Sequence, residues 1–173
     1  MALTLLLGGA RSGKSALAVR IASSWTGPVV FVATARAGDN EMAERIRRHR
    51  AARPPQWTTV EEPVEVLGKL CAAPGDAFLV VDCLSFWIAN LIEAGWDDET
   101  VEEEAAGVAR AASSRDTPSV IVSNEVGLGI VPATSLGRRY RDLLGRTNSL
   151  VAEAADDPLF VVAGRTLRLE AWP

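Results

Sequence analysis

The chain has 173 residues, of which 48% are hydrophobic and 23% charged, and its formal net charge is −4. These values predict one globular domain, residues 1–173, and exclude the generally basic surface of a nucleic-acid-binding protein, so we expect no nucleic-acid partner. No apolar run reaches the roughly 18 residues of a membrane span. The charge balance favours a small-molecule ligand. Cys71 and Cys83 lack the spacing of a zinc site and predict buried thiols in a reducing compartment, so we expect a cytoplasmic protein.

Five short apolar runs alternate with longer helical patterns along the chain. The runs are residues 3–7, 29–33, 78–84, 119–123 and 159–163. Continuous apolar strands separated by helices are typical of a parallel sheet that is covered on both faces. The ending LFVVAGRTLRLE predicts a terminal hairpin, because a Gly-Arg pair is followed by alternating leucines. We therefore expect a three-layer α/β fold with a mostly parallel sheet and an antiparallel C-terminal edge strand.

A phosphate-binding motif follows the first of these strands. GGARSGKS, residues 8–15, satisfies G-x-x-x-x-G-K-[ST] and precedes a helical pattern. The glycines allow backbone N–H groups to turn towards an anion, Lys14 can reach the β and γ phosphates, and the Ser15 hydroxyl can ligate Mg²⁺. The alternative is a glycine turn that binds nothing, but the strand and helix around the motif favour a P-loop NTPase.

The segment RIRRHRAARP, residues 45–54, contains the only histidine of the chain. We expect a helix that Asp39 caps and that continues to Arg53, where Pro54 ends it. A period of 3.6 residues places Arg47 and Arg48 away from the side that carries the histidine. That side carries Met42, Ile46, His49 and Arg53, with Arg45 close by.

The position of His49 among arginines allows two interpretations. A lone histidine on a partly apolar stripe is commonly a packed, hydrogen-bonded residue. Nearby positive charge, however, favours the neutral imidazole, and Arg45 and Arg53 can bind phosphate oxygens through bidentate hydrogen bonds. A neutral imidazole that attacks the α-phosphorus of a nucleotide would form a phosphoramidate and release pyrophosphate. The arginines therefore favour a nucleophilic histidine and nucleotidyl transfer.

Asp82 ends the apolar run of the third predicted strand, at the edge where open α/β sheets bind their ligands. This is the position of a Walker B aspartate, which would hold Mg²⁺ together with Ser15. The alternative is a carboxylate that only caps the following helix. The P-loop earlier in the chain favours the metal-binding role. P-loops nevertheless occur in kinases, ATPases, GTPases and motors, so these residues alone do not identify the reaction.

Three segments of the second half complete the pattern. The acidic stretch 97–116 predicts a helix whose negative charge lies in its first turns. SNEVGLGIVP, residues 123–132, predicts an ordered loop at the ligand edge, where Asn124 and Glu125 meet a metal or a substrate or form a structural turn. The next predicted helix carries Arg138, Arg139 and Arg141 near its start. These arginines bind phosphate, bind a neighbouring subunit, or lie on the surface in solvent.

The chain resembles the bifunctional adenosylcobinamide kinase/adenosylcobinamide-phosphate guanylyltransferases of cobalamin biosynthesis over nearly its whole length. The P-loop is generic, whereas EM-x-x-RI-x-x-H-x-x-x-RP and NEVG-x-GIVP in this order are specific. The resemblance rests on GGARSGKS (8–15), ATA (33–35), DNEMAERIRRHRAARPPQW (39–57), the strand ending in Asp82, SNEVGLGIVP (123–132), GRRYRDLLGRTN (137–148) and VVAG (161–164).

The resemblance implies phosphorylation of the aminopropanol hydroxyl of adenosylcobinamide with ATP or GTP and Mg²⁺, then transfer of GMP from GTP to that phosphate. It implies a RecA-like P-loop fold, a homotrimer, catalytic roles for His49 and Lys14, and a guanylylated His49. The implied nucleotide-binding residues are Gly8, Gly9, Ala10, Arg11, Ser12, Gly13, Lys14, Ser15, Ala33, Thr34, Ala35, Arg50, Ala51, Ala52, Arg53, Glu61 and Asp82.

Glu61 has three possible roles by its chemistry: it can accept from the N1–H and N2–H₂ donors of guanine, orient His49, or lie in solvent before a helix at Pro63. Two rival functions also remain. One is a P-loop kinase for another small alcohol, in which His49 only packs. The other is a RecA-like ATPase stimulated by nucleic acid, which would use the cluster Arg45–Arg53, and the net negative charge counts against it.

Overall fold

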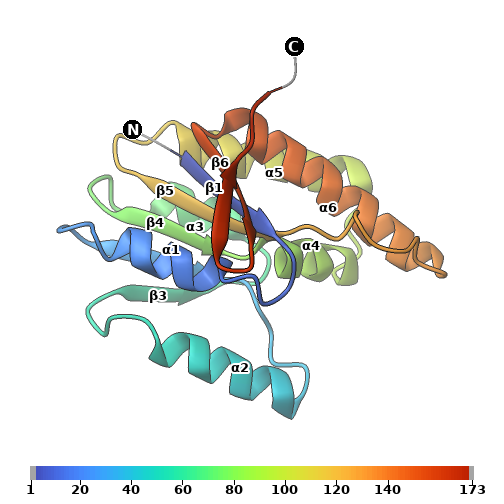
Figure 1. The fold of residues 1–173 in the computed structure, drawn as a ribbon, viewed down its shortest axis with the longest axis horizontal. Helices are drawn as coiled ribbons and strands as arrows, with labels where there is room; N and C mark the ends of the chain where they lie inside the picture. The colour runs from blue at the N-terminus through green and yellow to red at the C-terminus, as the bar shows by residue number, and fades with distance from the viewer. Residues whose placement is uncertain (1–2, 172–173) are drawn as a thin grey trace.

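The structure is a computed structural model that describes residues 3–171, and all of its strands form one seven-stranded sheet of order β3-β2-β4-β5-β1-β6-β7 (Figure 1). Every neighbouring pair is parallel except β6 and β7, which are antiparallel. This confirms the expected α/β fold with its antiparallel edge strand. The strands are β1 (Leu3–Gly8), β2 (Val29–Ala33), β3 (Thr58–Glu61), β4 (Phe78–Asp82), β5 (Ser119–Asn124), β6 (Asp157–Val162) and β7 (Arg165–Arg168).

Helices cover both faces of the sheet (Figure 1). Leu3, Leu5 and Leu7 of β1 point into a core with α3, α4, α5 and α6, whereas Leu6 points into a second core with α1. Because the central strands are buried on both faces, their sequences read as continuous apolar runs. The helices are α1 (Lys14–Ala22), α2 (Asn40–Ala51), α3 (Val66–Ala72), α4 (Leu84–Glu93), α5 (Asp98–Ser113) and α6 (Ser135–Ala154). None of the helices within residues 3–171 is long and apolar enough to cross a bilayer.

Strand β3 is absent from the sequence prediction. It is a short edge strand that pairs only with β2, and its residues are partly or fully exposed. The available signal was the β-branched run Thr58, Thr59, Val60, but an exposed edge strand lacks the apolar run that identified the others. The apolar run 78–84 extends beyond its strand, because α4 begins at Leu84, whereas Asp82 lies at the carboxyl end of β4 as predicted.

The two cysteines differ in their surroundings. Cys83 is buried and free, as predicted, because it directly follows the central strand β4. The prediction of a buried thiol is wrong for Cys71, which is exposed. Helix α3 turns Val66 and Leu70 towards the core, and Cys71 is the next residue round the helix from Leu70.

The predicted terminal hairpin is confirmed. Ala163 and Gly164 form the loop between β6 and β7, and both have positive φ angles, 50° and 71°. Two consecutive left-handed residues are the requirement of a type I′ turn, whose twist matches the paired strands. The backbone N–H of Gly164 donates to the carbonyl of Ser12 at 3.0 Å. The hairpin therefore packs directly against the phosphate-binding loop.

The helix that carries the histidine begins as predicted and ends early. The Asp39 carboxylate accepts from the backbone N–H of Met42 at 2.7 Å, which confirms the N-cap. The last helical residue is Ala51, and not Arg53, because Pro54 disfavours the helical conformation in the residue before it. The expected helix at Pro63 likewise begins later, at Val66.

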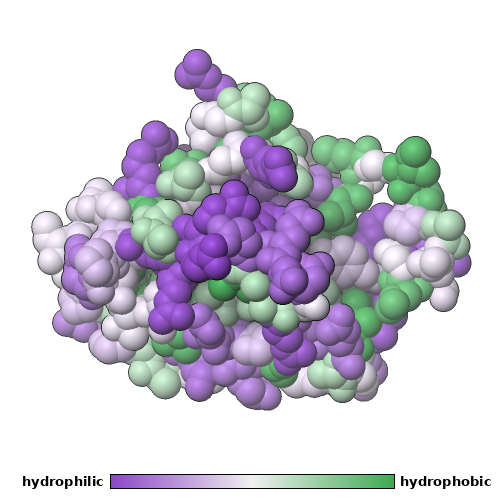
Figure 2. Space-filling model, turned by 90° about the horizontal axis from the view of Figure 1, so that it is seen from below, coloured by the Kyte–Doolittle hydropathy of each residue, from purple (hydrophilic) through white to green (hydrophobic). Residues whose placement is uncertain are grey.

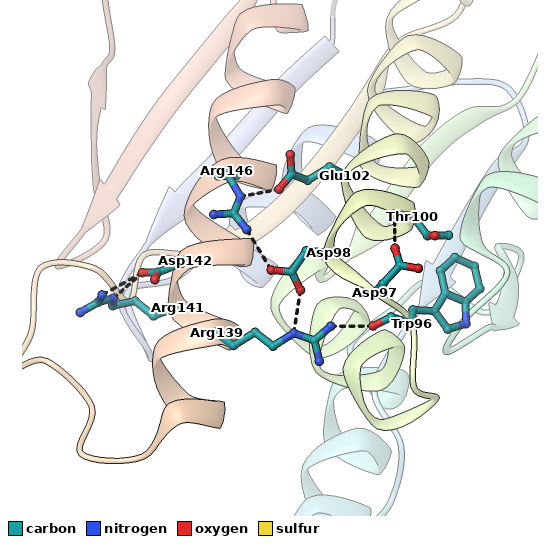
Figure 3. A network of polar contacts seen from close by, with 9 residues as sticks. All are labelled: Trp96, Asp97, Asp98, Thr100, Glu102, Arg139, Arg141, Asp142 and Arg146. Carbon is teal, nitrogen blue, oxygen red and sulfur yellow. Dashed lines mark hydrogen bonds and ion pairs between the residues drawn. The ribbon is translucent and has the colours of Figure 1, made fainter.

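The arginines at the start of α6 bond within their own chain (Figure 3). Arg139 pairs with Asp98 at 2.7 Å and donates to the carbonyl of Trp96 at 2.6 Å, so it joins α6 to the start of α5. Arg141 pairs with Asp142 at 2.8 Å. The predicted acidic helix 97–116 is α5, whose N-cap is Asp97. None of these side chains lines the cavity described below.

Candidate active site at the carboxyl edge of the sheet

A cavity of about 420 Å³ lies where the carboxyl ends of β1, β2, β4 and β5 meet. One of its walls is α2, which stands off the sheet and buries none of its side chains (Figure 1). The volume falls in the range of small-molecule sites. The lining residues that the sequence analysis named are Ala10, Arg11, Ser12, Gly13, Lys14, Ser15, Ala33, Ala35, Met42, Arg45, Ile46, Arg48, His49, Arg50, Arg53, Glu61, Asp82, Cys83 and Asn124.

Lys14 lies at the centre of the phosphate-binding loop. Its side chain is buried, and its Nζ donates to the carbonyl oxygens of Gly8 at 2.7 Å and Gly9 at 2.6 Å. Burial lowers the pKa of Lys14 from its usual value, while the nearby Asp82 carboxylate acts in the opposite direction. The ammonium group is thus held by neutral carbonyl groups, at the place where the motif expects phosphate.

Gly8 marks a close approach between the loop and strand β6. Its φ is 154°, and a Cβ atom at this position would lie 2.2 Å from the carbonyl oxygen of Val161. Gly13 has a φ of 104°, which L side chains rarely adopt. Both glycines of the motif are therefore required by the backbone itself.

We expect Gly8→Ala to lower thermal stability and to weaken nucleotide binding, because the loop must move away from the Val161 carbonyl. Overpacking of this kind typically costs about 1–3 kcal/mol. The measurement is the melting temperature with and without GTP. Gly9→Ala is the matched control for stability, since its Cβ would meet no atom within 4 Å. Equal melting temperatures for the two variants would contradict the expectation.

Asp82 and Ser15 form the candidate metal-binding pair. Burial raises the pKa of Asp82, whereas a hydrogen bond from the Ser15 side chain and the charges of His49, Arg53 and Lys14 oppose that rise. A partly buried carboxylate beside a hydroxyl suits Mg²⁺, which binds proteins through one or two oxygen ligands and keeps substrate phosphates and waters as the others. Among residues 3–171 no group of three His, Cys, Asp or Glu side chains is placed to hold a metal. The donors present therefore fit a magnesium ion bound together with nucleotide.

Thr34 has a different position from its neighbours Ala33 and Ala35. It is fully buried, its hydroxyl donates to the carbonyl of Cys83 at 2.7 Å, and it accepts from the backbone N–H of Cys83 at 2.9 Å. Its side chain joins β2 to the segment that follows Asp82. Gly8, Gly9, Thr34, Ala51 and Ala52 are the predicted nucleotide-binding residues that do not line the cavity.

His49 and Arg45 of α2 face the cavity together with Arg53, as the helical period predicts. Arg48 also lines the cavity, so the prediction that it points away from this side is wrong, because its long side chain reaches the cavity wall from the position next to His49. Partial removal from water is the largest cause that lowers the pKa of His49. The Asp82 carboxylate acts in the opposite direction, and Arg45 and Arg53 lower the pKa further. The neutral imidazole, the form that can act as a nucleophile, is therefore favoured near neutral pH.

The chain has one histidine, so its imidazole signal in an NMR titration is unambiguous. In the nucleotide-free protein we expect a midpoint below 6.5, and Arg45→Gln should raise that midpoint because a repelling charge is removed. Arg47→Gln is the matched control, since Arg47 lies on the same helix, pairs with Glu44 and does not contribute to the shift. A wild-type midpoint at or above 6.5 would contradict the electrostatic argument.

Two further contacts hold the arginines that follow His49. The Arg53 guanidinium lies 3.7 Å from the centroid of the Phe31 ring, and Phe31 stacks on Trp57. Arg50 pairs with Glu61 at 3.0 Å, which joins α2 to the end of β3. Glu61 therefore lies at the cavity edge beside an arginine and not before a helix. Because both partners are largely exposed, this ion pair adds little to the free energy of unfolding. Its effect is to fix the positions of Arg50 and Glu61 at the cavity edge.

Asn124 is held by buried polar partners at the end of β5. Its Nδ2 donates to the Ser85 hydroxyl at 2.8 Å, and its carbonyl accepts from Asn148 at 3.1 Å. The structure thus places the start of the segment 123–132 in the cavity wall, as the sequence suggested. Phe86 of α4 also lines the cavity and was missed, because an aromatic residue within an apolar helix gives no local signal of a ligand.

Comparison with known proteins identifies the family. Residues 4–169 match the model of the family described as "Cobinamide kinase / cobinamide phosphate guanyltransferase". The chain belongs to this family. It is 41% identical over 170 residues to the bifunctional adenosylcobalamin biosynthesis protein CobP of Pseudomonas aeruginosa, with 98% of each chain covered. It is 35% identical over 180 residues to the CobU protein of Salmonella typhimurium, where 96% of this chain and 98% of the relative are covered.

Solved structures confirm the fold of this cobinamide kinase/guanyltransferase family member. One solved ATPase domain has a TM-score of 0.53 and 14% identity, with 92% of this chain and 68% of that chain covered. An ATPase from the type III secretion system of pathogenic bacteria has a TM-score of 0.59 and 12% identity, covering 96% of this chain and 56% of that chain. At these identities the likeness is one of fold, which is that of P-loop ATPases.

Proposed function

We propose that this cobinamide kinase and cobinamide-phosphate guanylyltransferase performs both reactions at the cavity between the P-loop and α2. The reactions are phosphorylation of the aminopropanol hydroxyl of adenosylcobinamide with ATP or GTP, and transfer of GMP from GTP to the new phosphate. The observation that carries the proposal is that Lys14, Asp82 and His49 line one cavity of nucleotide size. Residues 1–173 would act as one catalytic domain.

In the kinase step the chain positions phosphate and supplies charge. Backbone N–H groups of residues 8–15 and the Lys14 ammonium would hold the β and γ phosphates, and Ser15 and Asp82 would hold Mg²⁺. A bound Mg²⁺ neutralises charge on the transferred phosphoryl group. The corrinoid hydroxyl attacks the γ-phosphorus, the bond to the β-phosphate oxygen breaks, and the hydroxyl proton leaves to solvent.

In the guanylyl step the neutral His49 imidazole attacks the α-phosphorus of GTP. The bond to the pyrophosphate oxygen breaks, pyrophosphate leaves, and the ring loses its remaining N–H proton to give a phosphoramidate. The corrinoid phosphate then attacks the same phosphorus, the P–N bond breaks, and the ring takes up a proton from solvent as it leaves as neutral imidazole. Arg45 and Arg53 flank His49 in the cavity wall and would bind the phosphate oxygens, while Glu61, beside Arg50, would accept from the guanine edge.

The remaining expectations concern the oligomeric state, the cellular location and the partners of the protein. We propose a homotrimer by family resemblance, a cytoplasmic location, and no nucleic-acid partner. The net charge of −4 supports the absence of a nucleic-acid partner. Arg45, Arg50 and Arg53 also line the cavity, where they would bind the phosphates of a nucleotide instead of a nucleic-acid backbone. Sedimentation velocity on the purified protein tests the trimer.

The experiment that tests the function uses cobinamide as acceptor and follows the corrinoid by mass. With ATP and Mg²⁺ we expect a product that has gained one phosphate and proceeds no further. Addition of GTP should convert it to a product that has gained one GMP, with release of pyrophosphate. A corrinoid that stays unmodified, while the protein hydrolyses nucleotide, would overturn the proposed function and favour a P-loop kinase for another alcohol.

A further inference from the structure

The segment that follows β5 carries an apolar surface that no part of the described chain covers. Within residues 3–171 seven large apolar side chains are exposed, and four of them lie between positions 128 and 136. They are Leu128 (83% exposed), Ile130 (97%), Val131 (62%) and Leu136 (60%). Figure 2 shows hydrophobic atoms gathered at the right, the end where the segment enters α6 in Figure 1, beside the hydrophilic face of α2. Exposed apolar groups that cluster in this way mark a binding surface.

Hydrogen bonds hold this segment in one conformation. The Glu125 carboxylate accepts from the backbone N–H of Gly127. Arg138 donates to the carbonyl groups of Pro132 at 3.0 Å and Ala133 at 2.9 Å, and Thr134 caps α6 by accepting from the N–H of Gly137. The apolar side chains between these two anchors therefore extend from an ordered loop.

The segment is continuous with the nucleotide cavity. Asn124, the last residue of β5, lines the cavity. The next backbone N–H, that of Glu125, donates to the carbonyl of Gly8 at 3.1 Å, so the segment leaves directly from the phosphate-binding loop. A substrate whose reacting arm enters the cavity at this end would place its remaining bulk against residues 125–136.

The size and chemistry of the proposed substrate select the occupant. A cavity of about 420 Å³ is suited to a nucleotide, and it cannot also enclose a corrin macrocycle with its side chains. The macrocycle must therefore lie outside, and its flat apolar faces gain free energy by covering apolar side chains. We infer that residues 125–136 are the docking surface for the corrin ring, with Leu128 and Ile130 as its main contacts. This inference rests on the proposed function.

The test compares the Leu128→Ser/Ile130→Ser variant with wild type in the cobinamide phosphorylation assay. We expect KM for cobinamide to rise at least tenfold, which corresponds to about 1.4 kcal/mol. We expect kcat to change less than twofold, and covalent labelling by GTP, which needs no corrinoid, to be unchanged. Leu167→Ser/Leu169→Ser is the matched control, because both leucines are exposed on the C-terminal hairpin, and its KM should equal that of wild type.

Three outcomes would overturn the inference. An unchanged KM in the loop variant, with an active wild-type enzyme, would show that the corrin ring docks elsewhere. A smaller sedimenting mass for the variant than for wild type would show that the surface contacts a second copy of the chain. A wild-type protein that forms the GTP adduct but never phosphorylates cobinamide would overturn the proposed function and this inference with it.

Discussion

Replacement of His49 by alanine is expected to abolish covalent guanylylation while phosphorylation of cobinamide continues. The side chain faces the cavity from α2, where desolvation and neighbouring arginines lower the pKa of the imidazole. Removal of a nucleophile typically costs roughly 10⁴-fold or more in rate. Intact mass after incubation with Mg²⁺ and GTP should show wild type gaining one GMP, labile in acid, and the variant gaining none.

Two controls make this result specific. Arg47→Ala removes an exposed cation from the same helix and should label like wild type, because Arg47 lies outside the cavity. Since α2 buries no side chain, His49→Ala should melt at the wild-type temperature, so loss of labelling is not loss of fold. An adduct of equal yield on His49→Ala would assign the nucleophile elsewhere, and absence of any wild-type adduct would make His49 a packing residue.

Replacement of Lys14 by alanine is expected to abolish both reactions. Its Nζ is the cation at the centre of the loop that would hold phosphate, 2.7 Å from the Gly8 carbonyl oxygen. Loss of one preorganised group that stabilises transition-state charge costs roughly 10²–10³-fold in kcat. The measurement pairs the rate of cobinamide phosphorylation with the yield of the GTP adduct.

The chain offers a matched control for this experiment, because Lys69 is its only other lysine. Lys69 pairs with Glu62 at 3.6 Å on the surface, and Lys69→Ala should leave both activities within about twofold of wild type. Wild-type labelling by GTP in Lys14→Ala, together with lost kinase activity, would contradict the proposal that the two reactions use one phosphate site.

The parts of the fold that depend on short segments could be predicted from the sequence. The P-loop, the five apolar strands and the hairpin each have a local signature, and the helical period correctly placed His49, Arg45 and Arg53 on the cavity side but wrongly placed Arg48 away from it. Helix ends were less accurate, as at Ala51, because the last residues of a helix fray and a sequence pattern fixes its end only to within one or two residues.

Contacts between distant segments could not be predicted in this way. Nothing near Thr34 indicates that its hydroxyl bonds to Cys83, 49 positions later in the chain. The pair of Arg50 and Glu61 requires β3, an edge strand without an apolar run. Phe86 reaches the cavity only because α4 begins at Leu84, two residues after Asp82. Each of these features depends on which strands become neighbours, and a local pattern does not contain that information.

The order of strands also bears on when this protein can bind a nucleotide during its synthesis. Strand β1, which carries the P-loop, pairs with β5 on one side and β6 on the other, so both neighbours come from residues 119–162. The Gly164 N–H bond to Ser12 adds a third late contact. A nascent chain would already contain the complete motif once Ser15 had been added. It would hold that motif in its working shape only once residue 164 had left the ribosome, so ribosome-bound chains halted before β6 should fail to retain GTP.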